Sequence, residues 1–360
     1  MRIIHCADLH LDAKMNTVLS AGQADERRGE LLMTFRRMTA YAQKNSVSAI
    51  LISGDLFDAK RISAQARNTV YETIQACSDI LFYYLPGNHE KEGFIEQLPE
   101  LPENLRIFTD TWRTYEESGI SFSGLVLTRE NADTAANQLH LQPEKINIVM
   151  LHGQAAEYGH AGHAEYIDLG KLQNRYVDYL ALGHVHQYKE GKLDERGIWC
   201  YPGCLEGRGF DECGIHGFVV MDIDPEKHRI IHRFIPFARR TLYEREVDVS
   251  GCTTTLQMEE RVENAVMEPA EKDLVKVILR GELDVTVEKN TAHLLQMLQQ
   301  RFYAARLEDR TTLRVDYRTY ALDASLKGEF VRVVEAETQL SEEEKAEIIR
   351  CGLQALTGER

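Results

Sequence analysis

Short apolar runs that end in polar residues are the feature of this sequence that most limits its fold. The runs end in the sequences DLH, GDLFD, GNHE, LHG and GHVH. The first run, residues 3–7, is too short for a helix and rich in β-branched residues, which is typical of a buried strand. Amphipathic stretches at 23–45 and 64–77 separate the first three runs. Strands that alternate with helices predict an α/β core.

The polar residues at the ends of these runs are expected to gather at one edge of the sheet. Asp8 and His10 point the same way because side chains alternate along a strand with a period of two. The carboxyl ends of strands are a place where α/β proteins bind ligands. Glycines beside several of these residues permit tight turns and close approach of the backbone. The full set is Asp8, His10, Asp55, Asn88, His89, His152, His184 and His186.

The types of donor in this set predict two metal ions. Two aspartates, one asparagine and four of the five histidines supply enough donors for two ions if one carboxylate bridges them. Several imidazoles disfavour Mg²⁺ and Ca²⁺, which prefer oxygen ligands, and the set lacks the cysteines of a structural zinc site. Mn²⁺, Fe²⁺ or catalytic Zn²⁺ remain. A site with two such ions typically serves displacement reactions at phosphorus.

The series of motifs resembles the signature of calcineurin-like metallophosphoesterases. Within that superfamily, the stretches HCADLHLD, YPGCLEGRGFDECGIHGFVVMDI and SLKGEFVRVV resemble the SbcD and YhaO-type DNA-repair nucleases, and the YhaO-like proteins most closely. The resemblance is strong over residues 1–223. It implies an α/β fold with a β-sandwich flanked by helices in residues 1–240, followed by a smaller α+β capping domain.

The resemblance also implies a role for each polar residue. One ion would be bound by Asp8, His10, Asp55 and His186, and the second by Asp55, Asn88, His152 and His184. Asp55 would then bridge the two ions, and His89 would be the catalytic histidine that contacts the phosphate and assists the leaving group. Mn²⁺ is the expected metal, with Fe²⁺ or Zn²⁺ as alternatives. The chain has GDLFDAK where protein phosphatases of the superfamily have GDxVDRG, which argues against that activity.

Four further residues of the first domain are candidates for a place in the site. Arg208 in EGRGF follows the motif region and is the candidate for contact with a substrate phosphate. His160 and His163 lie in a Gly/Ala-rich segment, where they either touch substrate or are simply solvated. His5 lies inside the first apolar run, and we expect it to pack or hydrogen bond there rather than bind metal.

The cysteines do not predict disulfides. The seven cysteines form no CxxC motif and are an odd number, which fits a reducing compartment. Cys200, Cys204, Cys213 and His216 could be imagined as a zinc site, but their spacing matches no common zinc module. Buried thiols are the alternative that we favour.

The pattern changes near residues 237–241, where a second domain is expected to begin. Residues 241–335 predict three strands and two helices in a βαββ-like α+β unit that caps the site, with its last strand at 311–322. Arg310, Arg314 and Arg318 would share one face of that strand, where they either contact phosphates or are solvated.

The tail, residues 336–360, predicts a C-terminal helix. Ser341 and Glu344 form a capping box, which marks where such a helix begins. Its apolar stripe contains Ile349, Leu353 and Leu356. This stripe either packs on its own domain or docks an ATPase, as the C-terminal region does in SbcD-like systems.

Composition limits the classes of protein to which this chain can belong. The chain has 360 residues and a net charge of −15, and neither of its halves carries the basic excess of a nucleic-acid-binding domain. Any interaction with DNA must therefore come from the site. The chain contains no apolar stretch long enough to span a bilayer and no signal-peptide pattern, so we expect a cytoplasmic protein that does not contact a membrane.

We therefore expect a two-metal phosphodiesterase that cuts DNA. The chain has no GxxxxGK[ST] motif, so the resemblance implies a separate SbcC/YhaN-like coiled-coil ATPase as partner. It also implies a homodimer. A small-molecule phosphodiesterase or nucleotide pyrophosphatase is one alternative, favoured by the acidic charge. A non-catalytic scaffold for the ATPase is the other.

Overall fold

A computed structural model of the chain describes all residues except 16–18, 59–61, 88–92, 157–165 and 358–360. It divides into two compact units, Met1–Thr241 and Leu242–Arg360. The division falls just after the FARR segment. No helix in the part of the chain that the structure describes is both long enough and apolar enough to cross a membrane.

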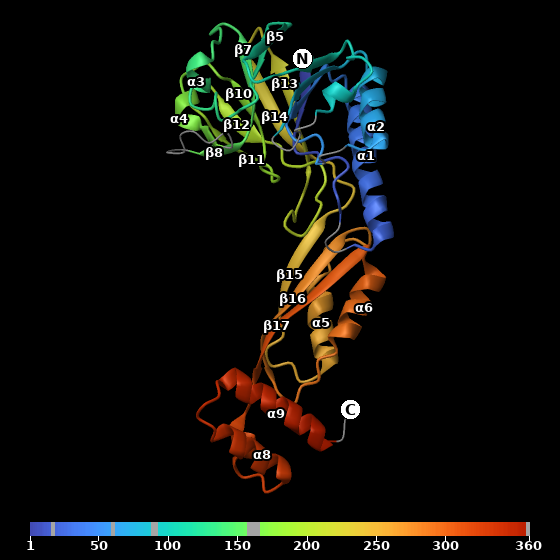
Figure 1. Cartoon of the computed structure of the whole chain (residues 1–360), viewed down its shortest axis with the longest axis vertical. Coiled ribbons are helices and arrows are strands. Elements are labelled where there is room, and N and C mark those ends of the chain that lie inside the picture. The colour runs from blue at the N-terminus through green and yellow to red at the C-terminus, as the bar shows by residue number, and fades with distance from the viewer. Residues whose placement is uncertain (16–18, 59–61, 88–92, 157–165, 358–360) are drawn as a thin grey trace. The chain divides into compact units, whose positions relative to one another are not determined.

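The first unit is built on two six-stranded sheets (Figure 1). The first sheet has the order β14-β13-β1-β2-β3-β4. Strands β1 to β4 are parallel, and β13 runs antiparallel to both of its neighbours, β1 and β14. Its strands are β1 Arg2–Cys6, β2 Ala49–Ser53, β3 Leu81–Leu85, β4 Leu105–Ile107, β13 Gly217–Asp224 and β14 Arg229–Pro236. The second has the order β11-β12-β10-β7-β6-β5, with parallel inner strands and an antiparallel strand at each edge. Its strands are β5 Arg113–Glu117, β6 Ile120–Gly124, β7 Ile146–His152, β10 Tyr179–Gly183, β11 Lys189–Lys192 and β12 Ile198–Tyr201.

The two sheets pack face to face, which confirms the expected β-sandwich. Side chains of β1 alternate between two apolar clusters, so Ile3 packs toward the second sheet and Ile4 toward the helices. Between the sheets, the ring of Tyr83 stacks on that of Phe122 with 4.3 Å between centroids. A third cluster covers the outer face of the second sheet with the short helices α3 Ala135–Gln138 and α4 Leu169–Leu172.

Two long helices cover the outer face of the first sheet. Helix α1 (Ala21–Lys44) begins at a capping box formed by Ser20 and Gln23, and α2 (Ala64–Ala76) is capped by Ser63. These bounds agree with the amphipathic stretches predicted from the sequence. Shorter elements complete the unit: η1 Ile95–Gln97, and the two-stranded sheet of β8 Gln154–Ala156 and β9 Tyr166–Asp168.

A buried charge cluster lies under α1. Arg27 is 1% exposed and donates to Glu30 Oε2 at 2.6 Å and to the carbonyl oxygen of Gly207 at 2.7 Å. Arg240 donates to the same Glu30 carboxylate, and Glu206 Oε2 lies 3.5 Å from Arg27 Nη1. Two positive and two negative charges therefore balance inside the unit. The cluster ties α1 to the segment around residue 206 and to the end of the first unit.

The second unit begins with a parallel three-stranded sheet of order β15-β16-β17. Its elements are β15 Leu242–Asp248, α5 Thr255–Ala265, β16 Leu274–Asp284, α6 Thr291–Arg301 and β17 Ala304–Arg314. The three strands and two helices alternate as expected from the sequence, and the resulting order is βαβαβ, with every neighbouring pair of strands parallel, rather than βαββ. One apolar cluster joins the two helices to the sheet.

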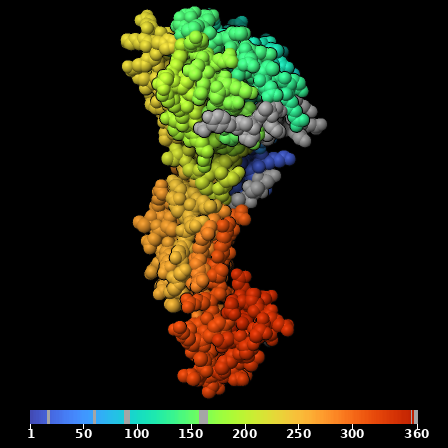
Figure 2. All heavy atoms as spheres, turned by 90° about the vertical axis from the view of Figure 1, so that its left-hand side faces the viewer, coloured from blue at the N-terminus to red at the C-terminus, as the bar shows by residue number. Residues whose placement is uncertain are grey.

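Three helices follow the sheet and have an apolar cluster of their own. They are α7 Tyr317–Ala321, α8 Leu326–Glu335 and α9 Glu342–Thr357. We call them the helical module; its atoms form the red lobe beyond the orange sheet atoms of the same unit in Figure 2. The capping box is confirmed, since Glu344 N donates to Ser341 Oγ and Ser341 N to Glu344 Oε2. Ile349 and Leu353 are buried in the module, so this part of the predicted stripe packs on its own domain, whereas Leu356 is 39% exposed.

The strand predicted at 311–322 is wrong beyond Arg314. The chain there forms α7, because the Asp316 side chain accepts from Arg318 N and caps a helix in place of the continued strand. Arg318 therefore does not share a strand face with Arg310 and Arg314. In the structure, Arg310 pairs with Glu308 on its own strand.

The buried cluster under α1 generates a prediction about stability. Replacing Arg27 by Met leaves the Glu30 and Glu206 carboxylates with less compensating charge in a buried site, so we expect the free energy of unfolding to fall by about 3–5 kcal/mol. Urea unfolding followed by circular dichroism measures it. Arg28→Met, one position along the same helix, removes an exposed pair with Asp25 and should cost no more than about 1 kcal/mol. Equal losses in the two variants would contradict the role of the buried cluster.

Candidate metal centre

The segments that follow β1 and β2 bring three of the predicted ligands together. These segments stay paired beyond the strands, with Asp8 N donating to the Gly54 carbonyl at 3.1 Å and His10 N to the Asp55 carbonyl at 2.9 Å. Asp8, His10 and Asp55 are each no more than 2% exposed. Two carboxylates are thus placed in a buried position, where their charge must be compensated.

The second sheet supplies the other predicted ligands that the structure describes. β7 ends at His152, and His184 and His186 follow β10. The backbone N of His184 donates to both carboxylate oxygens of Asp8, at 2.9 and 3.0 Å. The site therefore lies where the carboxyl ends of strands from both sheets meet.

Two glycines allow the sheets to approach this closely. A Cβ atom at Gly54 would lie 1.9 Å from His152 Nδ1, and one at Gly183 would lie 1.8 Å from the Ser53 carbonyl oxygen. Any larger residue would therefore separate the two strand ends. The close approach expected from the glycines in the motifs is present in the structure.

The backbone of the site is strained. Asp8, His10, Asp55 and His184 have φ values of 51°, 43°, 49° and 107°. Residues other than glycine rarely adopt positive φ, and each such residue costs on the order of 1–3 kcal/mol. The surrounding sheets must hold these four residues in place. Their concentration at one point is typical of a functional site.

A hydrogen bond at Nδ1 fixes the ring orientation of two histidines of the site, His152 and His186. His152 Nδ1 donates to the Ser53 carbonyl at 2.9 Å, and His186 Nδ1 donates to Glu212 Oε1 at 2.6 Å. The Nε2 atoms are then the ones available as ligands. His186 Nε2 faces His10 Nε2 at 3.2 Å, and His152 Nε2 is buried with no hydrogen bond in the described part of the chain.

The spacing of the donor atoms fits metal binding. One ligand atom each from Asp8, His10 and His186 lie within 4.8 Å of one another, and the same is true of Asp8, Asp55 and His152. Asp55 Oδ2 lies 3.8 Å from His10 Nε2 and 3.4 Å from His152 Nε2, two nitrogens expected to bind different ions. Buried carboxylates beside imidazole nitrogens are a donor set that suits Mn²⁺, Fe²⁺ or Zn²⁺.

The pKa values of the site reflect buried negative charge. Burial raises the pKa of Asp8, against the opposing effect of His152, His10 and His186. Burial alone would lower the pKa of His152, but the carboxylates of Asp55 and Asp8 outweigh it and raise that pKa to about 9. Burial and the nearby His152 lower the pKa of His184. The carboxylates thus attract positive charge into the site, which bound metal ions would supply.

Several predicted residues lie outside the described part of the chain. They are Asn88, His89, His160 and His163. The second-ion ligand role of Asn88, the catalytic role of His89 and both alternatives for the other two histidines therefore stay predictions.

Two residues that sequence reasoning did not select lie against the site. Glu212 is 3% exposed and binds His186, and Asp58 Oδ1 lies 3.4 Å from His10 Nδ1. Burial alone would raise the pKa of Glu212, but hydrogen bonds from His186 and Arg208 outweigh it and hold that pKa well below its usual range. Glu212 lies in a loop without periodicity, so its contact with His186 leaves no pattern in the sequence.

Arg208 lies beside the site, and its guanidinium binds carboxylates. Its Nη2 donates to Glu212 Oε1 at 2.6 Å, and its Nη1 lies 3.5 Å from Asp58 Oδ2. Contact with a substrate phosphate stays a prediction for this residue.

The remaining candidates have structural roles. His5 is buried and hydrogen bonded to the Tyr179 hydroxyl at 3.0 Å, as expected, and burial lowers its pKa to about 3. Cys204 Sγ lies 3.2 Å from His216 Nδ1, and Cys200 is fully buried in β12. Among the described residues, the groups with metal-like spacing contain no cysteine. Cys200 and Cys204 are therefore buried thiols, as favoured over a zinc site, whereas Cys213 is partly exposed.

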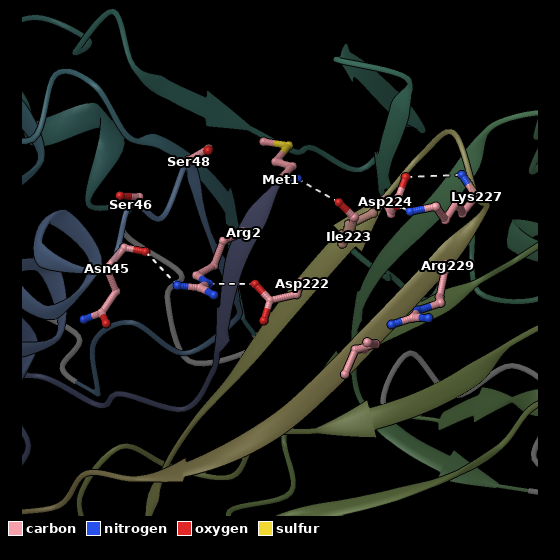
Figure 3. Close-up of a pocket in the computed structure, with 11 residues that line it drawn as sticks. Met1, Arg2, Asn45, Ser46, Ser48, Asp222, Ile223, Asp224, Lys227 and Arg229 are labelled. Carbon is pink, nitrogen blue, oxygen red and sulfur yellow. Dashed lines mark hydrogen bonds and ion pairs between the residues drawn. The ribbon is translucent and has the colours of Figure 1, made fainter.

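A separate pocket of about 510 Å³ lies at the other end of β1, around Met1 and Arg2 (Figure 3). Its charges are largely paired with each other, since Arg2 binds Asp222 and Lys227 binds Asp224. The residues that line it include none of the predicted metal ligands.

Comparison with known proteins agrees with this geometry. Residues 1–188 match the model of the family described as calcineurin-like phosphoesterase. The chain is 27% identical over 308 residues to the uncharacterized metallophosphoesterase YhaO of Bacillus subtilis, an alignment that covers 78% of this chain and 72% of that protein. It is 27% identical over 291 residues to the DNA double-strand break repair protein Mre11 of Haloferax volcanii, covering 78% of this chain but only 62% of the relative. It is 24% identical over 301 residues to the D subunit of the nuclease SbcCD of Staphylococcus epidermidis, covering 73% of this chain and 76% of the relative.

Solved structures resemble part of the chain more distantly. The protein TT1561 of Thermus thermophilus has a TM-score of 0.43 at 12% identity, covering 65% of this chain and 98% of that one. A dimetal phosphatase from Danio rerio has a TM-score of 0.40 at 12% identity, covering 62% of this chain and 92% of that one.

The family match spans more than half of the chain. This protein therefore belongs to the calcineurin-like phosphoesterase family and is a metal-dependent phosphoesterase.

Proposed function

We propose that this protein is a two-metal phosphodiesterase that acts on DNA. The observation that carries the proposal is the convergence of buried carboxylate oxygens and imidazole nitrogens from Asp8, His10, Asp55, His152 and His186. DNA is proposed as substrate because the matched relatives include proteins named for DNA double-strand break repair and a named nuclease. We also propose Mn²⁺ as the metal and a homodimer as the assembly.

The residues of the chain have distinct roles in this proposal. Two bound ions would activate a water molecule and polarise the phosphoryl oxygens of the diester. Asp55 is proposed to bridge them, because its Oδ2 lies near imidazole nitrogens of both ligand groups. Backbone contacts and rigid strand ends hold Asp8 and Asp55 in place, so the donors need little rearrangement. His89 is proposed to contact the phosphate and to assist departure of the leaving oxygen.

A small-molecule diester is the second candidate substrate. The net charge of −15 opposes nonspecific attraction of a long polyanion, and this favours a small substrate. We still prefer DNA as the substrate, because the matched relatives are named for DNA repair and for a nuclease.

We further propose that the helical module docks a separate coiled-coil ATPase. The relative from Staphylococcus epidermidis is named as one subunit of a complex. Leu322, Leu326 and Val333 are 97%, 69% and 63% exposed on or beside α7 and α8, although much of the module is tightly packed. Leu326 and Val333 lie seven residues apart on α8, and exposed apolar residues at such a helical spacing are typical of a surface that binds another helix.

Hydrolysis assays test the activity and the substrate together. Wild-type protein should degrade end-labelled linear DNA in Mn²⁺ but not in EDTA. His89→Ala should reduce the rate by roughly 10²-fold or more, since it removes the proposed group that assists the leaving oxygen, and should retain the bound metal. His140→Ala, which changes an exposed histidine of the same unit, should retain activity.

Other outcomes of this assay favour other functions. Turnover of bis-p-nitrophenyl phosphate with intact DNA would support the small-molecule phosphodiesterase. Two bound metals with neither substrate hydrolysed would support the scaffold.

Metal counting tests the bridging role of Asp55. Asp55→Asn removes the charge of a ligand shared by both ions, so the bound metal should fall from two ions per chain to fewer than one. His186→Asn should affect one ion and leave about one per chain. Mass spectrometry of the dialysed proteins gives both numbers. Equal metal content in the two variants would show that Asp55 does not bridge.

Pull-down experiments test the docking surface. A Leu326→Asp and Val333→Asp double variant should lose binding to the SbcC/YhaN-like ATPase, because it places two charges on the apolar surface, and should keep its phosphodiesterase activity. Leu256→Asp changes another exposed leucine of the same unit and serves as control. Unchanged binding by the double variant would place the ATPase elsewhere.

A further inference from the structure

The loop of residues 203–216, which we call the support loop, packs directly behind His186. Cys204 N donates to the His186 carbonyl oxygen at 3.0 Å. Gly203 has a φ of +76°, and a Cβ atom there would lie 2.8 Å from the same oxygen. The loop therefore touches the backbone of a predicted ligand where no larger residue fits.

The same loop also binds the ring of His186, through Glu212. Glu212 Oε1 accepts from His186 Nδ1 at 2.6 Å and from Arg208 Nη2 at 2.6 Å, and Oε2 accepts from Arg208 N at 2.7 Å. Both carboxylate oxygens are thus used, in a residue that is 3% exposed. The carboxylate has a fixed position from which it holds the ring.

The backbone of Glu212 is held from both sides. Its N–H donates to the Gly209 carbonyl at 2.9 Å, and its carbonyl accepts from His216 Nε2 at 2.8 Å. Because Nε2 of His216 carries the proton, its Nδ1 is the acceptor for the Cys204 thiol at 3.2 Å. The side chains of Cys204 and His216 therefore brace the loop, while the backbone N of Cys204 contacts the His186 carbonyl oxygen.

We propose that Glu212 is a positioning residue for His186 and that Arg208 holds Glu212 in place. A carboxylate on Nδ1 keeps the proton there, turns Nε2 toward the metal and makes the ring a stronger ligand. His152 has a neutral carbonyl in this position, whereas His186 has a full negative charge. The inference rests on the proposed two-metal site and assigns residues outside its predicted ligands.

Metal affinity is the first measurement. Mn²⁺ binding to the full chain is measured by isothermal titration calorimetry for the wild type, Glu212→Ala and Glu212→Gln. Loss of such a partner typically weakens metal binding by about 10- to 100-fold, and we expect this loss at one of two sites in Glu212→Ala. Glu212→Gln keeps an acceptor for His186 Nδ1 and should recover part of the affinity.

A matched control exists in the same unit. Glu190 accepts from His232 Nε2 at 2.6 Å, the same distance as the Glu212 contact, and neither residue is a predicted ligand. Glu190→Gln should leave Mn²⁺ affinity at the wild-type value. A similar loss in Glu190→Gln and Glu212→Gln would overturn the positioning role.

Arg208 separates positioning from contact with substrate. If Arg208 acts through Glu212, Arg208→Gln weakens Mn²⁺ binding. If it acts only on a substrate phosphate, the variant keeps wild-type Mn²⁺ affinity and raises KM for bis-p-nitrophenyl phosphate, which would overturn its part in the inference.

The outcomes distinguish this inference from the proposed function. Two Mn²⁺ ions bound by the wild type and by Glu212→Ala with equal affinity would overturn the inference alone. No Mn²⁺ binding by the wild type would overturn the two-metal proposal and the inference with it. Circular dichroism shows whether each variant is folded. If Glu212→Ala does not fold, the Mn²⁺ affinities of Glu212→Gln and Arg208→Gln test the inference in its place. These two variants keep most of the side-chain volume.

Discussion

The burial of two negative charges, those of Asp8 and Asp55, is the constraint on which the rest of the site depends. Both carboxylates are almost fully removed from water at the place where two sheets meet. Such groups are costly unless hydrogen bonds and opposite charges compensate them. The backbone N of His184 binds Asp8, and His152 lies against Asp55 with a raised pKa. The site is therefore built to hold positive charge, which explains why its donors suit divalent ions.

The fold supplies the rigidity that this arrangement requires. Four residues of the site have left-handed backbone, and such strain persists only where the surroundings hold it. Continuous apolar packing on both faces of the first sheet provides that support. Asp8 and Asp55 follow strands of one sheet, whereas His152, His184 and His186 follow strands of the other. Residues that are distant in sequence can meet because the sandwich brings the two sets of strand ends together.

Much of the first unit could be predicted because its signals are local. Apolar runs indicated the strands, and amphipathic stretches indicated the two long helices. The strand predicted at residues 311–322 was wrong in its second half. The alternating pattern there favours a strand, but the Asp316 side chain caps a helix, and the chain forms that helix instead. The buried pairs of Arg27 and Glu212 were missed for another reason. A charged residue on a helix or in a loop has no pattern that reveals a partner brought near only by the tertiary fold.

The support loop contacts both the buried charge cluster under α1 and a predicted metal ligand. Its early residues, Glu206 and Gly207, belong to the buried cluster with Arg27, while its later residue Glu212 binds a predicted metal ligand. Arg27 contacts Glu30, Glu206 and Gly207 and none of the predicted ligands that the structure describes, so its direct effect is on the stability of the unit. Glu212 contacts His186 itself, so its effect reaches the geometry of the metal site. Because both contacts hold one short loop, a change in the first can loosen the second, and measuring metal affinity together with unfolding separates the two effects.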